Sequence, residues 1–205
     1  MVNTWPQVSD SSSHVRTAVR LAWATIVWNV IEAVAAIAAG TVAGSIALVG
    51  FGLDSTVEVM SAAVIVWQFR GLAHERERRA LRLIALSFFA LGGYVAVRAI
   101  IDLVVGSQPH SSAIGIGIAT ASLIVMPLLA RAKRRAGALI GSASVLADSN
   151  QTQLCTYLSA ILLGGLILNV TVGWWWADPL AAIAIAVLAI NEGRQAWRGD
   201  VCDAC

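Results

Sequence analysis

Residues 44–66 read "GSIALVGFGLDSTVEVMSAAVIV", an apolar run of membrane-spanning length that contains two acids, Asp54 and Glu58. A helix needs about 20 mostly apolar residues to cross a hydrocarbon core that is ~30 Å thick. Read with a window of that length, the chain contains this span, at approximately 44–68, and five more, at 19–40, 82–105, 112–130, 141–170 and 175–192. The sequence therefore predicts an all-α membrane protein with six transmembrane helices.

The composition supports this prediction. Of 205 residues, 58% are hydrophobic and 13% are charged, roughly half the charge of a soluble globular domain. A conventional soluble enzyme is excluded, and the sequence contains no phosphate-binding loop or nucleotide-binding fingerprint. We expect a polar, disordered N-terminal segment over 1–18, a six-helix transmembrane domain over 19–194 and a short cytoplasmic tail over 195–205.

Basic residues between the spans set the predicted orientation. Lys and Arg are concentrated in "RGLAHERERRALR" (70–82), in "RAKRRAG" (131–137) and at Arg194 and Arg198, whereas the other connections contain none. Because Lys and Arg stay on the cytoplasmic side of a membrane protein, both termini are predicted to be cytoplasmic. This alternation explains the basic runs without nucleic-acid contacts, so we expect no nucleic-acid partner.

Six ionisable residues fall inside the predicted spans, where a charge costs several kcal/mol and usually marks a functional path. They are Glu32, Asp54, Glu58, Arg98, Asp102 and Asp148. Arg98 and Asp102 have the spacing of an ion pair on one helix face, and we favour mutual neutralisation over a substrate role for them. Glu32 has two interpretations: it hydrogen-bonds a neighbouring helix as a protonated acid, or it lines a polar path.

The pair Asp54 and Glu58 is the sharpest of these features. On a helix the two side chains stand one turn apart on one face, so both carboxylates can reach a single cation or share a proton. Neither has a basic neighbour within its own span. The pair therefore predicts a cation site inside the membrane.

Residues 141–163, "GSASVLADSNQTQLCTYLSAILL", repeat the pattern of the opening stretch. The alignment places Asp54 on Gln151 and Glu58 on Cys155. The two segments are three spans apart and so run in opposite directions, which predicts an inverted repeat with substrate sites near the midplane. At 1.5 Å per residue, Asp54 and Gln151 both lie ~14 Å deep from opposite faces. The alternatives are a chance match between Gly-Ser helix starts and an inert Cys155.

The two stretches resemble the cation diffusion facilitators, a family of six-helix divalent-metal/proton antiporters. "GSIALVGFGLDSTVE" (44–58) is similar to the family's Ser-x-Ala-Leu opening, followed by an acidic or His residue and another acid four positions later. "VLADSNQTQLC" (145–155) is similar to the family's Ala-Asp-x-x-His-x-x-x-Asp. The resemblance implies export of a divalent metal in exchange for protons. Carried over position by position, the four metal ligands are Asp54, Glu58, Gln151 and Cys155.

The sequence also departs from the family pattern. Phe51 stands where many relatives carry an acid, and the second pair of ligands is Gln and Cys where His and Asp are common. The chain ends shortly after the sixth span, so we expect a member without the cytoplasmic C-terminal domain that many relatives use for dimerisation and metal sensing. Any homodimer would then form through the transmembrane domain, and we expect the protein in a bacterial cytoplasmic membrane.

The ligand types indicate the substrate. Two carboxylates, a thiolate and an amide oxygen suit zinc or cadmium better than magnesium, which prefers all-oxygen sites. Because a metal competes with protons for carboxylates and thiols, the same ligands account for proton coupling. We expect a divalent metal ion as substrate, protons as the coupling ion and no prosthetic group. Candidate accessory residues are Asp148, Glu32, Cys202 and Cys205.

The chain ends in Cys202-Asp-Ala-Cys205. A C-x-x-C pair can bind a soft metal, cycle as a dithiol or do nothing in a frayed terminus, and we favour the inert tail over auxiliary metal capture. The pair keeps a second class of function open, in which the protein is a non-transporting membrane metal sensor or a thiol-redox membrane protein.

Overall fold

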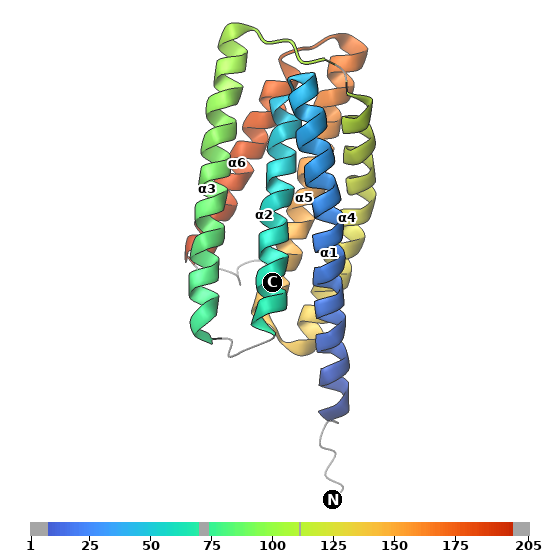
Figure 1. The fold of residues 1–205 in the computed structure, drawn as a ribbon, viewed down its shortest axis with the longest axis vertical. Coiled ribbons are helices and arrows are strands. Elements are labelled where there is room, and N and C mark those ends of the chain that lie inside the picture. The colour runs from blue at the N-terminus through green and yellow to red at the C-terminus, as the bar shows by residue number, and fades with distance from the viewer. Residues whose placement is uncertain (1–7, 70–73, 111, 199–205) are drawn as a thin grey trace, which may run out of the picture.

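The computed structural model describes residues 8–69, 74–110 and 112–198, and the regular structure in these ranges is entirely α-helical. The helices are α1 (Val8–Ala43), α2 (Ile46–Gln68), α3 (His74–Val105), α4 (Ala113–Ile140), α5 (Ala143–Val172) and α6 (Ala177–Arg198). They stand side by side in one bundle and alternate in direction, so the start of α1 and the end of α6 lie toward the same end (Figure 1).

The helices confirm an all-α membrane protein. Five of them are long and apolar enough to cross a membrane, namely Ser13–Ala43, Ile46–Trp67, Ala85–Val105, Ala113–Ile140 and Ser144–Val172. The sixth predicted span corresponds to α6, which is helical throughout but carries Asp178, Glu192 and Arg194 within its 22 residues. These charges near both ends shorten its apolar stretch.

Several helices extend beyond the predicted spans. The described part of the polar N-terminal segment is helical from Val8, so our expectation of disorder is wrong there. Residues 131–137, which we expected to form a loop, belong to α4. The physical reason is that Ala, Arg and Lys are strong helix formers, so a basic segment prolongs a helix past its apolar core.

The two aligned Gly-Ser pairs have the same local structure. Gly44 (φ 67°) and Gly141 (φ 62°) both adopt the left-handed conformation that glycine tolerates best. The following serine then caps a helix in each case: Ser45 Oγ accepts the Leu48 N–H at 3.1 Å, and Ser142 Oγ accepts an N–H at the start of α5. The two aligned helices therefore start in the same way.

The contacts among α1, α2 and α3 resemble those among α4, α5 and α6. α1 packs on α2 as α4 packs on α5, and α2 contacts α3 as α5 contacts α6. Further contacts join α1 to α4, α2 to α5 and α3 to α6, the helices that the predicted repeat relates to one another. α2 and α5 lie in the middle of the bundle (Figure 1). α2 also contacts α6, and no contact of similar extent joins α3 to α5 among the described residues, so the contacts follow the predicted repeat only in part and the inverted repeat stays a prediction.

The core of the bundle is apolar and involves the two central helices. Leu48, Phe51, Leu162 and Ile185 are fully buried in it. Phe51 therefore packs in the apolar core, at the position where many cation diffusion facilitators carry an acid. On the outside, large apolar side chains such as Val104 are exposed, as expected for surfaces that face lipid.

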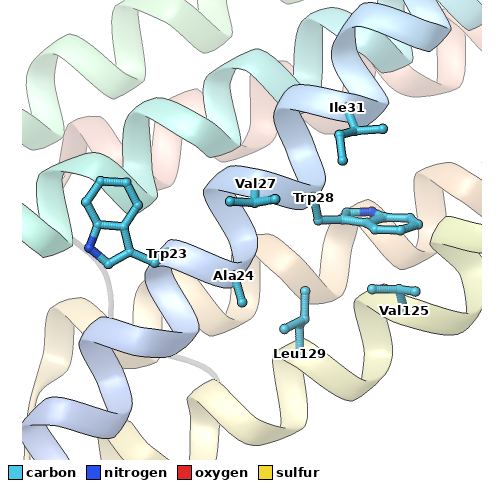
Figure 2. Close-up of a pocket in the computed structure, with 7 residues that line it drawn as sticks. All are labelled: Trp23, Ala24, Val27, Trp28, Ile31, Val125 and Leu129. Carbon is cyan, nitrogen blue, oxygen red and sulfur yellow. The ribbon is translucent and has the colours of Figure 1, made fainter.

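An apolar groove lies between α1 and α4 (Figure 2). Its lining consists of Trp23, Ala24, Val27, Trp28, Ile31, Val125 and Leu129. Of these, Trp23, Val27 and Ile31 are also exposed on the outside of the bundle. The groove presents no carboxylate, thiol or amide ligand to a metal ion, so it is not the predicted cation site.

Candidate metal site

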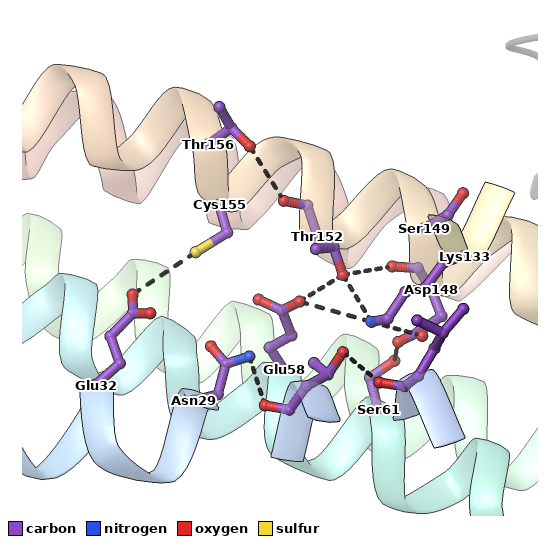
Figure 3. Close-up of polar contacts among 12 residues, drawn as sticks. Asn29, Glu32, Glu58, Ser61, Lys133, Asp148, Ser149, Thr152, Cys155 and Thr156 are labelled. Carbon is purple, nitrogen blue, oxygen red and sulfur yellow. Dashed lines mark hydrogen bonds and ion pairs between the residues drawn. The ribbon is translucent and has the colours of Figure 1, made fainter. Parts of the chain in front are cut away.

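Three of the four predicted ligands share one buried region of the bundle. Asp54 and Glu58 of α2 and Cys155 of α5 are at most 7% exposed. The Cys155 thiol lies 3.9 Å from Glu32 Oε1, so Glu32 belongs to the same region. Glu32 comes from α1, which places this helix at the site as well (Figure 3).

Glu32 accepts hydrogen bonds from three other helices. The Ser122 hydroxyl of α4 donates to Oε2 at 2.5 Å, and the Ser55 hydroxyl of α2 donates to Oε1 at 3.2 Å. The Cys155 thiol of α5 lies 3.9 Å from the same Oε1. Of the two interpretations of Glu32, the structure thus shows the hydrogen bonding to neighbouring helices, and the contact with Cys155 also places it beside a predicted ligand.

A glycine brings Glu32 close to α2. A Cβ atom at Gly52 would lie 2.7 Å from Ile37 Cγ1 and 3.1 Å from the carbonyl oxygen of Ala33, so only glycine permits the present approach of α1. Small residues at a helix interface allow such close packing in membranes. Ser55, one turn further along α2, thereby reaches Glu32.

Glu58 has one occupied and one unoccupied carboxylate oxygen. The Thr152 hydroxyl donates to Oε1 at 2.5 Å, and Lys133 Nζ lies 3.9 Å from the same atom. Oε2 is buried and has no hydrogen-bond partner. A buried carboxylate oxygen without a donor is costly, so this atom is free to accept a proton or a cation.

Lys133 is the residue that sequence reasoning placed wrongly. We expected it on a cytoplasmic loop, but its side chain is 2% exposed inside the bundle, where Nζ forms an ion pair with Asp148 Oδ2 at 2.8 Å. Nζ also donates to Thr152 Oγ1 at 2.8 Å. Asp148 in turn accepts a hydrogen bond from Ser61 Oγ at 3.2 Å (Figure 3). Lys133 therefore joins α4 to α5 and approaches α2.

A helical pattern in the sequence would have located Lys133. The buried positions of α4 recur every three or four residues: Gly115, Ala119, Ser122, Met126, Ala130, Lys133, Ala136 and Gly137. Lys133 continues this stripe of mostly small residues, whereas Arg131, Arg134 and Arg135 are exposed. The positive-inside rule counts all four residues alike, because it considers composition and not the face of the helix.

Gln151 and Asp54 stand apart from these hydrogen bonds. The Gln151 amide nitrogen is buried without a partner, and its neighbour Thr152, which we did not predict, contacts Glu58 instead. Asp54 is buried on α2, one turn before Glu58.

The acids and the thiol do not form a coordination sphere in this arrangement. Across the described ranges, no group of three or more His, Cys, Asp and Glu side chains is placed to hold a metal ion. Hydroxyl donors and Lys133 occupy the carboxylates of Glu32 and Glu58 instead. Cys202 and Cys205 lie outside the residues that the structure describes.

Two acids serve the architecture at one end of the bundle. Arg98 Nη2 and Asp102 Oδ1 form the predicted ion pair at 3.4 Å, with Ser107 Oγ 3.3 Å from the same oxygen. Asp178 of α6, which sequence reasoning missed, accepts hydrogen bonds from Ser45 Oγ and from the Ala47 N–H, the latter at 3.3 Å. Asp178 therefore ties the start of α6 to the start of α2.

Comparison with known proteins decides the family. Residues 22–198 match the sequence model of the cation efflux transmembrane domain. The chain belongs to the cation efflux family, the cation diffusion facilitators. Because the members of this family are transporters, the expectation that this cation efflux protein is not an enzyme is confirmed.

Individual relatives match over different lengths. The chain is 23% identical to Transmembrane protein 163 of Xenopus laevis over 189 residues, which cover 90% of this chain and 67% of that protein. It is 27% identical to an uncharacterized transporter of Synechocystis over 172 residues, 77% of this chain and 54% of that protein. With the cation-efflux pump FieF of Shewanella oneidensis it shares 32% identity over 91 residues, 44% of this chain and 29% of that pump. This cation efflux chain thus spans about two thirds of the first relative and less of the others.

Proposed function

We propose that this cation efflux protein exports zinc or cadmium from the cytoplasm of a bacterium in exchange for protons. The observation that carries the proposal is the unpartnered Oε2 of Glu58, buried beside Asp54 and Cys155. A buried acceptor of this kind is stabilised by a proton or by a metal ion, which are the two species that an antiporter exchanges.

The proposed ligands are Asp54, Glu58, Gln151 and Cys155, with Glu32 as an accessory residue. A thiolate with carboxylate oxygens matches zinc, and its softness extends the range to cadmium. Magnesium, which retains its waters and prefers oxygen ligands, fits these donors less well.

Metal binding competes with the hydrogen bonds of the metal-free site. A metal ion that engages both oxygens of Glu58 takes Oε1 from Thr152, and Ser55 and Ser122 must release Glu32 if that residue turns to the metal. These donors belong to α5, α2 and α4, so an incoming ion changes the contacts between helices as well as between side chains. The proposed ion thereby biases the bundle between two packings, as a transporter that alternates its access requires.

Proton coupling follows from the same ligands. A thiol and carboxylic acids lose their protons when a metal binds, and they regain them when it leaves. Protons that enter from the far side of the membrane would then expel the metal. The exchange keeps the charge inside the low-dielectric site small in both states.

A transport assay with a metal panel tests the proposed function. Reconstituted wild-type protein should move zinc and cadmium but not magnesium, and Asp54→Asn should abolish the flux in a protein that still folds. Asp102→Asn, which alters the ion pair with Arg98 outside the site, is the matched control and should retain it. Equal transport by wild type and Asp54→Asn would remove the proposed site.

A further inference from the structure

Lys133 brings a basic side chain into the proposed site. Its whole residue is 1% exposed, and Nζ lies 2.8 Å from Asp148 Oδ2, 2.8 Å from Thr152 Oγ1 and 3.9 Å from Glu58 Oε1. A charged side chain at membrane depth is costly, and such residues are usually functional. Lys133 lies close enough to the predicted ligand Glu58 to affect metal binding during transport.

The contacts of Lys133 lie on one side of Glu58. Ser61 follows Glu58 along α2, and Asp148 precedes Thr152 along α5, so the ion pair lies toward the end of the bundle where α2 finishes and α5 begins. The charge distribution predicts that this end faces the cytoplasm. Glu58, Thr152, Lys133, Asp148 and Ser61 form a continuous chain of contacts across α2, α4 and α5 (Figure 3).

We infer that Lys133 is a tethered cation, which closes the cytoplasmic side of the site while it is empty and which the substrate metal must displace from Glu58. The inference rests on the proposed function. In the empty protein, the ammonium group partly compensates Glu58 and Asp148, so the acids tolerate burial without metal. It also links α4 to α5 next to the route by which a cytoplasmic ion would reach Glu58.

Electrostatic repulsion makes the two cations mutually exclusive. A divalent ion bound to Glu58 would lie within a few ångströms of Nζ, where like charges in a poorly solvated site repel strongly. Metal binding therefore weakens the approach of Lys133 to Glu58 and loosens the contact between α4 and α2. Metal binding is thereby linked to the contact of Lys133 with Glu58. Lys133 both stabilises the bundle and competes with the metal, which limits metal affinity.

Binding measurements on the intact protein in lipid nanodiscs test this role. Zinc titrations would compare wild type with Lys133→Met, which keeps the length of the side chain without its charge. The competitor model predicts zinc affinity at least about tenfold higher for Lys133→Met, because the repelling charge is gone. In transport, the same variant should show a lower KM and a lower kcat, since a tightly held ion leaves slowly. Arg131→Met, at an exposed position of the same helix, is the matched control and should match the wild type in both assays.

A second pair of variants covers the case in which Lys133→Met does not fold with Asp148 left unpaired. Asp148→Asn frees Lys133 to approach Glu58, and it should therefore weaken zinc binding. Lys133→Met/Asp148→Asn removes both charges of the ion pair, an exchange that proteins often tolerate. The double variant should bind zinc more tightly than Asp148→Asn alone.

The outcomes separate this inference from the proposed function. Wild-type protein that binds neither zinc nor cadmium would overturn the proposed function itself. If wild type binds zinc and Lys133→Met binds it equally or more weakly, with the double variant no tighter than Asp148→Asn, then Lys133 is a structural residue and the competitor model is wrong.

Discussion

Thr152 donates its hydroxyl hydrogen to Glu58 over 2.5 Å, which joins α5 to α2. The same oxygen accepts a hydrogen bond from Lys133 Nζ at 2.8 Å. The Thr152 side chain thus connects the two central helices and also contacts Lys133 of α4. Because Glu58 is a proposed ligand, its hydrogen bond with Thr152 breaks whenever a metal ion takes Oε1 in addition to the open Oε2.

Removal of the Thr152 hydroxyl should destabilise the metal-free protein more than the metal-bound one. Thr152→Val keeps the shape of the side chain but removes the hydroxyl donor of Glu58 Oε1, while Lys133 keeps its ion pair with Asp148; the expected cost is about 1–3 kcal/mol. Thermal unfolding in detergent should therefore show a lower Tm without zinc and a larger rise in Tm when zinc is added. Thr156→Val, whose hydroxyl bonds only within α5 at 3.5 Å, serves as the control. An unchanged response to zinc in Thr152→Val would contradict the account.

Cys155 should determine the preference for soft metals. Cys155→Ser keeps a small polar side chain but removes the thiolate, so cadmium transport should fall more than zinc transport. Competition between the two metals in proteoliposomes measures the ratio directly. An unaltered ratio would indicate that Cys155 is the inert core residue that the sequence also allows.

Glu32 should contribute to metal affinity as well as to packing. Glu32→Gln retains a polar group for the hydroxyls of Ser55 and Ser122 but removes the charge, so we expect weaker zinc binding in a folded protein. Ser122→Ala removes one donor to Glu32 and should lower the stability of the bundle, but zinc affinity should not fall, because this donor no longer competes with the metal for Glu32. If Glu32→Gln instead binds zinc like the wild type, Glu32 only holds helices together.

Asp178 should matter for stability and not for metal selectivity. It accepts hydrogen bonds from Ser45 and from the Ala47 N–H at the start of α2, so Asp178→Ala leaves two donors unpaired. The expected loss is about 1–3 kcal/mol of unfolding free energy, visible as a lower Tm. The relative transport of zinc and cadmium by the remaining folded protein should not change, and a shift in that ratio would assign Asp178 a role at the site.

The sequence predicts the architecture well because hydrophobic length and charge distribution govern membrane proteins. It also places Asp54 and Glu58 in one buried region, because their spacing puts them on one face of α2. It misses Lys133 because the positive-inside rule assigns basic residues to loops, whereas α4 continues through them and turns this one inward. It does not point to Thr152, which contacts Glu58, because an alignment of repeats does not give the rotation of each helix about its axis.

The most direct test of the central claim is a simultaneous record of metal and proton movement in proteoliposomes. A lumenal zinc indicator and a lumenal pH indicator would follow wild type and Glu58→Gln after zinc is added outside. The account predicts zinc entry with matching proton exit for the wild type, and neither movement for Glu58→Gln. Zinc entry without a change of lumenal pH, or undiminished exchange in Glu58→Gln, would contradict metal/proton antiport through this site.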